Sequence, residues 1–292
     1  MSTAAPRTLD TARRAAPPRA ARRDLGYFWR RFRRSRLAVA ALAYLIAVHL
    51  VAIFASSLAP HSPEAIDLFN QMAPASREHP LGTDENGRDI LSRLLFGARA
   101  SLAVGLAAML MAITVGTTMG SLSGFYGGWA DVVIMRMTDG MLTIPTFFLA
   151  ILILAVFGSG IHNVVLAIGM TGWMVVARVV RAEVLRILPQ EFILASRAIG
   201  AGNARVVIRH ILPQTFPSVI VAATLGVAFA VLAESALSYL GLGVQPPTPT
   251  WGNMLTGAQH YVWTRPRLAV YPGVAILLTV LSYNAIGDAL RD

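Results

Sequence analysis

The sequence contains no lysine and no cysteine, and these two absences exclude several kinds of chemistry. All 25 of its basic residues are arginine. Without lysine the chain cannot form the Gly-x4-Gly-Lys-Ser/Thr loop that binds nucleotide phosphates, and it cannot form a Schiff base. Without cysteine it has no disulfide, no thiolate zinc site, no iron–sulfur cluster and no cysteine nucleophile. Any step driven by ATP must therefore be performed by another chain.

Charged residues are also scarce. They make up 14% of the 292 residues, against about 25% in an ordinary soluble domain. Hydrophobic residues make up 55%, and the mean hydropathy is +0.58. A bilayer core about 30 Å thick requires about 20 apolar residues in a helix. Uncharged runs of this length cover residues 37–59, 101–122, 140–177 (two helices joined by a turn at 157–160), 210–233 (effectively starting after Pro217) and 268–287.

These runs are continuously apolar rather than alternating, which predicts helices and not barrel strands. The predicted fold is an all-α membrane protein with six transmembrane helices. Its predicted parts are an Arg-rich cytoplasmic tail with an interfacial helix (1–36), a first transmembrane helix with an extracytoplasmic segment (37–99) and a five-helix core (100–292).

The distribution of arginine predicts the orientation in the membrane. Six spans place both termini on one side, and that side carries 19 arginines against 6 on the other. Because positive residues favour the cytoplasmic side, both termini are predicted to be cytoplasmic. Residues 1–24 are predicted to be disordered. The mixed aromatic and arginine residues of 25–34 predict an interfacial helix at the bilayer and not a nucleic-acid-binding segment.

The segment at residues 190–213 is the most informative one on the predicted cytoplasmic side. Its pattern predicts two short helices, of which the second runs to Pro213. The first is predicted to end at Gly200, because glycine adopts a left-handed conformation without steric cost. A compact, basic and amphipathic pair of helices is typical of a docking surface for a soluble partner. The pattern leaves open an ordered surface loop without a partner.

This segment resembles the cytoplasmic coupling loop of binding-protein-dependent ABC importer permeases, whose pattern is Glu-Ala-Ala-x3-Gly-x9-Ile-x-Leu-Pro. Ser196 is a conservative change at the second alanine, Leu194 stands in place of Glu, and His210 stands in place of Ile. The positions that match are Ala195, Gly200, Leu212 and Pro213. The resemblance implies that these four residues, with Glu191, Leu194, Ser196 and His210, form the loop that couples the permease to its ATPase.

Three further segments make the resemblance more specific, namely 79–94, 237–252 and 284–292. Together they resemble the second (C-type) permease subunit of dipeptide, oligopeptide and nickel ABC importers, and the match runs from about Phe28 to Asp292. The resemblance implies a type I importer permease of the bacterial inner (plasma) membrane that is not itself an enzyme. The sequence shows no cofactor-binding motif.

The same resemblance implies several partners. A related permease subunit would complete the pore as a heterodimer, two ATPase subunits would bind the coupling loops, and an extracytoplasmic binding protein would deliver the solute. The solute implied is a peptide, with nickel or another small solute as the alternative. Closure of the ATPases is expected to move residues 190–213 as a lever, and Gly200→Asp is expected to uncouple transport without preventing membrane insertion.

Several residues inside the predicted spans invite a more specific interpretation. Glu234 lies in the fifth span, where an acid is a candidate for function. It either lines the translocation path or anchors its helix to the outer loop by hydrogen bonds. Arg136 and Asp139 in the third span are three residues apart and are predicted to pair. Pro145 is predicted to kink the same helix.

Glycine and histidine spacing give two further expectations. Gly116, Gly120 and Gly124 repeat a Gly-x3-Gly pattern, which predicts close packing against another helix. The six histidines show neither His-x3-His nor His-Glu-x2-His spacing, so no metal site is predicted.

The long outer loop 241–272 is predicted to fold into short helices. With the segment 60–100, this loop either contacts the binding protein, covers the pore mouth or forms a structural cap.

Two other classes of protein are the alternatives. An ion-coupled secondary transporter usually has inverted repeats and more spans, and neither is visible in the sequence. An intramembrane serine hydrolase would need a base within reach of Ser159. Ser159 falls in a predicted turn, and the sixth span holds no histidine.

Overall fold

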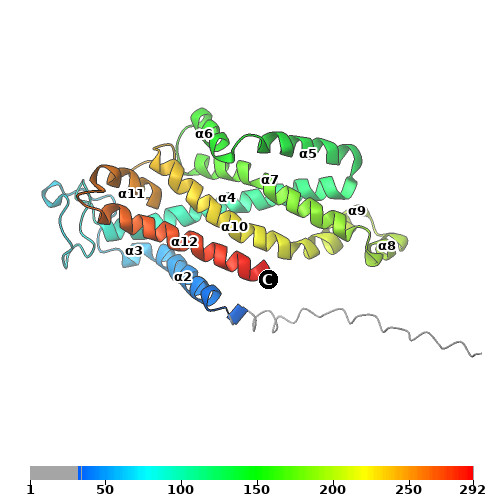
Figure 1. The fold of residues 1–292 in the computed structure, drawn as a ribbon, viewed down its shortest axis with the longest axis horizontal. Helices are drawn as coiled ribbons and strands as arrows, with labels where there is room; N and C mark the ends of the chain where they lie inside the picture. Colours follow the sequence, from blue (N-terminus) through cyan, green and yellow to red (C-terminus); the bar gives the residue numbers. More distant parts are fainter. Residues whose placement is uncertain (1–31, 34, 292) are drawn as a thin grey trace, which may run out of the picture.

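The computed structural model describes residues 32–33 and 35–291, and the regular elements of that part of the chain are all helical (Figure 1). The predicted all-α class is therefore confirmed. The stretch predicted to be disordered, and most of the predicted interfacial helix, lie outside the described residues. The α-helices are α2 (Arg36–Ile53), α3 (Ala55–Leu58), α4 (Ile90–Tyr126), α5 (Gly128–Leu142), α6 (Thr146–Phe157), α7 (Ile161–Ile187), α8 (Glu191–Ala198), α9 (Asn203–Val206), α10 (Leu212–Tyr239), α11 (Trp251–Ala258) and α12 (Arg267–Arg291).

Five helical stretches in the described part of the chain are long and apolar enough to cross a membrane. They are α2, α4, α7, the run Asn203–Tyr239 that ends with α10, and α12. Helices α5 and α6 qualify only as a pair, and they are bent by 89° where they meet. The chain therefore reaches the predicted six crossings if this bent pair counts as one.

The prediction of one kinked third helix containing Pro145 is wrong. Pro145 immediately precedes α6, and its backbone is extended rather than helical. A proline disfavours helical backbone at the residue before it and cannot donate the hydrogen bond that a helix interior requires. The two halves of the expected helix are therefore separate, and they join at nearly a right angle.

Helix α4 begins eleven residues before the apolar run that predicted it. Asp89 caps its first turn, because the carboxylate accepts a hydrogen bond from the N–H of Ser92 at 2.7 Å. The helix has 37 residues, which corresponds to about 55 Å at 1.5 Å per residue. It is therefore longer than the bilayer core is thick, and its charged first turns can extend beyond the core.

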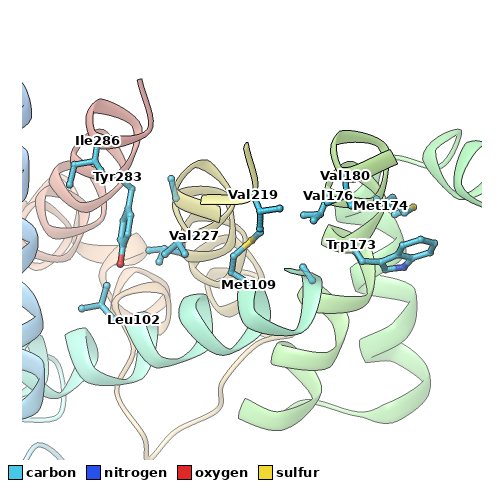
Figure 2. Close-up of a cluster of buried hydrophobic side chains, with 14 of the residues drawn as sticks. Leu102, Met109, Trp173, Met174, Val176, Val180, Val219, Val227, Tyr283 and Ile286 are labelled. Atoms are coloured by element: carbon cyan, nitrogen blue, oxygen red, sulfur yellow. The ribbon is translucent and has the colours of Figure 1, made fainter. Parts of the chain in front are cut away.

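Helix α4 is the central helix of the bundle: α7, α10 and α2 pack against it, whereas α12 packs mainly on α10 and α2 (Figures 1 and 2). Figure 2 shows Met109 of α4 directed towards Val219 and Val227 of α10. All three side chains belong to one buried apolar cluster that also includes Trp173 of α7 and Tyr283 of α12. The core of the subunit is thus built around a single long helix.

Three glycines of α4 allow α7 to approach closely, as their spacing predicted. A Cβ atom on Gly116 would lie 2.6 Å from the carbonyl oxygen of Trp173 and from Val176. A Cβ atom on Gly124 would lie 2.9 Å from Val184, and one on Gly120 would meet the carbonyl of Ala177. The packing role predicted for the Gly-x3-Gly pattern is confirmed within the subunit.

Two ion pairs join α5 to α7. Arg181 donates to both carboxylate oxygens of Asp131 at 2.5 and 2.6 Å. Arg178 donates to Asp139 at 2.5 Å. The predicted pair between Arg136 and Asp139 is therefore wrong, because Asp139 pairs with Arg178 of α7 instead.

The outer loop contains α11 and a 3-10 turn at Gln259–Tyr261, so the expectation of short helices there is confirmed. Thr250 begins α11 with a reciprocal capping box, in which its hydroxyl accepts from the N–H of Asn253 and the Asn253 side chain accepts from the N–H of Thr250. Figure 1 shows α11 and α3 at one end of the bundle and α8 and α9 at the other.

Candidate functional site

The segment between α7 and α10 forms the predicted pair of short helices. Helix α8 is followed by a turn at residues 199–202, then by α9, and then by a π-helical turn at Val207–Ile211 that leads into α10. The sequence predicted the two helices but not the π turn. Pro213 has no N–H to donate to the carbonyl four residues before it, and π turns arise where the regular ladder of hydrogen bonds is interrupted.

Gly200 ends α8 through a pair of backbone hydrogen bonds. Its φ of +86° is in the left-handed region. The N–H of Gly200 donates to the carbonyl of Arg197 at 2.9 Å, and the N–H of Ala201 donates to the carbonyl of Ser196 at 3.1 Å. This is the Schellman arrangement, in which glycine is favoured. A Cβ atom on Gly200 would meet nothing within 4 Å, so the requirement for glycine is conformational and not steric.

The two faces of this segment differ. Ile193, Val206 and Ile211 are fully buried in the main apolar cluster. On the outside, large apolar side chains are exposed, including Leu194 at 55% and Ile199 at 87%. The segment is therefore anchored by these buried side chains and exposes other large apolar side chains. We name the exposed set the coupling face; its residues are Phe192, Leu194, Ile199 and Ile208.

The remaining residues of the predicted coupling loop occupy distinct places. Glu191 and Ala195 are exposed on α8, whereas Ser196 is buried. His210 lies in the π turn, with its ring centroid 6.5 Å from that of Phe192. Leu212 and Pro213 are the first two residues of α10. All eight predicted residues lie in this one segment, as their sequence positions require, and Leu194 is exposed.

Contacts with α4 hold α8 in place. The guanidinium of Arg197 lies over the ring of Phe125 near the end of α4, 5.2 Å from the ring centroid. This cation–π contact and the buried Ile193 connect the short helix to the spine of the bundle.

Glu234 is fully buried and lies in a cluster of hydroxyl groups at the other end of α10. Its carboxylate accepts hydrogen bonds from Ser101 of α4 and from Ser238, each at 2.8 Å. The oxygen of Ser101 in turn accepts from the N–H of Trp251 at 3.2 Å. Glu234 therefore joins α10 to α4 and, through Ser101, to the first residue of α11.

Replacing Glu234 tests this anchoring arrangement. Glu234→Ala leaves buried hydroxyl groups without an acceptor, which costs about 1–3 kcal/mol, so we expect a clearly lower midpoint of thermal unfolding in detergent. Glu234→Gln keeps an amide oxygen that can accept a hydrogen bond, so we expect a smaller decrease. Loss of uptake in Glu234→Gln with no change in stability would instead indicate a role in the translocation path.

A second polar cluster orders the segment before α4. Arg88 donates to Asp84 at 2.7 Å and to Glu85 at 3.0 Å, and Arg93 lies 3.4 Å from Asp84. His79 and Asp89 form a further pair at 3.0 Å. These contacts hold residues 79–89 against the first turn of α4, at the end of the bundle that carries α11 (Figure 1).

Histidine spacing predicted no metal site, but the structure brings together three groups that could hold a metal ion. His61, Glu78 and His79 place one possible ligand atom each within 4.8 Å of one another. His61 is far from the other two in sequence, so no short motif could have indicated the group. Only the fold of the segment between α3 and α4 brings these residues together.

Comparison with known proteins agrees with this architecture. Residues 116–292 match the family described as binding-protein-dependent transport system inner membrane component. Residues 25–75 match the N-terminal TM domain of oligopeptide transport permease C. Among solved structures, the chain is similar to the MetNI methionine ABC transporter in inward-facing conformations, with a TM-score of 0.56 and 21% identity over 68% of this chain and 94% of that one. That likeness supports the fold alone.

Curated relatives are similar over nearly the whole chain. The dipeptide transport system permease protein DppC of Alkalihalophilus pseudofirmus is 40% identical over 264 residues, which cover 90% of this chain and 87% of the relative. The glutathione transport system permease protein GsiD of Escherichia coli O6:K15:H31 is 43% identical over 266 residues, which cover 91% and 88%. The resemblance inferred from the sequence motifs is confirmed. The chain belongs to the family of inner membrane components of binding-protein-dependent transport systems, as a permease of the C type found in peptide ABC importers.

Proposed function

We propose that this permease subunit forms half of the translocation pathway of an ATP-driven importer of peptides. The observation that carries this proposal is the sequence identity of 40–43%, over about nine-tenths of the chain, with permeases named for dipeptide and glutathione transport. Glutathione is itself a small peptide, so the two names agree on the class of solute. Nickel or another small solute is the alternative within the same family.

The coupling face supports a partner that supplies the energy. Helix α8 exposes large apolar side chains although it lies outside the apolar spans. Exposed large apolar side chains gathered in one short segment outside the bilayer support an interaction site there. The chain has no lysine for a phosphate-binding loop, so hydrolysis of ATP belongs to separate subunits. We propose that one of two ATPase subunits binds residues 190–213 of this chain.

The other proposed partners are those that membership of this family implies. A second, related permease subunit would pair with this one as a heterodimer and complete the pore. An extracytoplasmic binding protein would deliver the solute at the end of the bundle that carries α11 and the segment between α3 and α4. Gly200 and the Leu212–Pro213 junction would fix the shape of the lever that transmits ATPase closure to the pore.

The proposed location is the bacterial inner membrane, with both termini in the cytoplasm. The excess of arginine on one side supports this orientation. Residues 1–36 would form the cytoplasmic tail, 37–99 the first span with its extracytoplasmic segment, and 100–292 the permease core. In this orientation α8 and α9 face the ATPases.

Uptake by the complete importer in proteoliposomes tests the proposed function. We expect accumulation of a labelled dipeptide or of glutathione only when ATP and the binding protein are both present. Accumulation driven by an ion gradient without ATP would overturn the proposal in favour of a secondary transporter. ATP-driven uptake of nickel but of neither peptide would keep the mechanism and change the solute.

A further inference from the structure

The imidazoles of His61 and His79 face each other just before α4. Their ring centroids are 4.6 Å apart, and the ring planes are inclined by 32°. The Nδ1 atom of His61 is buried and has no hydrogen-bond partner among the described residues. A buried polar atom without a partner is costly. An imidazole nitrogen left in this state beside a second imidazole is available to a ligand.

Glu78 completes a set of three ligands. One of its carboxylate oxygens and one nitrogen of each imidazole all lie within 4.8 Å of one another. Glu78 is exposed, so its side chain can rotate towards the two rings. Two imidazoles and one carboxylate are a common ligand set for Zn²⁺ in sites that keep a fourth position open.

The position of Asp89 gives independent support. Nδ1 of His79 is 3.0 Å from the carboxylate of Asp89, whose side chain is fully buried. This contact leaves Nε2 of His79 for a ligand. Histidines that bind metals usually donate their other ring N–H to a carboxylate, which fixes the ring and makes the ligating nitrogen more basic. The buried Asp89 is itself held in place by the N–H and the hydroxyl of Ser92, each at 2.7 Å.

We propose that His61, Glu78 and His79 form a binding site for a divalent transition metal, for which Zn²⁺ fits the ligand set. His61 follows α3 closely, whereas His79 is held to the first turn of α4 through Asp89. A bound ion would therefore fasten the intervening segment to the core of the subunit. The site depends on neither the coupling face nor the solute.

Titration of the full-length chain with Zn²⁺ tests this site. The protein is purified in mild detergent with a tag that contains no histidine, and binding is measured by calorimetry. We expect one ion per chain, and an affinity at least about tenfold weaker in His61→Ala and in Glu78→Ala, since even residues that only support metal ligands contribute about 10–100-fold. His260→Ala is the matched control, because His260 is an exposed histidine in the outer loop, and we expect it to bind Zn²⁺ like the unchanged protein.

Thermal unfolding separates loss of the ligand from loss of the fold. The His61 side chain makes no hydrogen bond in the described part of the chain, so His61→Ala in EDTA is expected to melt like the unchanged protein. Zn²⁺ should raise the melting temperature of the unchanged protein and not that of the variant. Absence of Zn²⁺ binding by the unchanged chain, or equal affinity in His61→Ala and the unchanged chain, would overturn the proposal.

Discussion

Gly200→Asp is expected to reduce ATP-driven uptake by at least about tenfold while the chain still inserts and folds. Gly200 has a φ of +86°, and a residue with a side chain in a sparsely populated conformation costs about 1–3 kcal/mol. The new carboxylate would also face the negative end of α8, which is unfavourable. Tenfold corresponds to about 1.4 kcal/mol, which is within the cost of the altered turn. Uptake and membrane content are measured in the same vesicles.

Gly200→Asn is the matched control for this experiment. Asparagine has nearly the size of aspartate, and both adopt the left-handed conformation more readily than most residues, but asparagine carries no charge. Because no described residue other than the chain neighbours of Gly200 lies within 4 Å of the added Cβ position, the Cβ atom of neither variant clashes with the subunit. We expect Gly200→Asn to retain much more uptake than Gly200→Asp. Normal uptake by Gly200→Asp would contradict the coupling role of this turn.

Gly120→Leu is expected to have the largest effect on stability. The added Cβ would meet the carbonyl of Ala177 and lie 2.9 Å from the Cβ of Val180, so α4 and α7 could no longer pack together. Overpacking of this kind costs about 1–3 kcal/mol or more. We expect a much lower unfolding temperature in detergent and little folded protein in the membrane.

Gly120→Ala and Gly273→Ala are compared as a test of the same contact. Gly120→Ala is expected to destabilise the subunit, because its Cβ alone collides with backbone. Gly273→Ala in α12 meets nothing within 4 Å, and alanine favours helix by up to about 1 kcal/mol over glycine. We therefore expect Gly273→Ala to be neutral or stabilising. Equal melting temperatures for the two variants would contradict the close contact between α4 and α7 at Gly120.

The sequence was sufficient for the features that depend on local composition. Long apolar runs predicted the spans, the repeated glycines predicted close helix packing, and Gly200 predicted the end of α8. Each of these signals is a property of residues close together in the chain. The coupling segment could be located for the same reason, since its helices and turn are consecutive.

Three of the features that were missed involve residues other than sequence neighbours or charges that interrupt an apolar run. The early start of α4 was hidden by Arg99 and Arg93, which interrupt the apolar run; Arg93 is buried beside Asp84. Asp139 was paired with Arg136 by helix spacing, but the closer partner is Arg178 of α7. The grouping of His61 with His79 likewise arises only from the fold of the segment before α4.

Site-specific crosslinking of the coupling face tests the central claim most directly. The chain has no cysteine, so a single cysteine carrying a photoreactive probe reports one position. Ile199→Cys places it on the coupling face, where Ile199 is 87% exposed. Phe69→Cys places it at a fully exposed residue between α3 and α4. We predict that the ATPase is crosslinked at residue 199 and not at residue 69; no crosslink at 199, or equal crosslinking at both positions, would contradict the account.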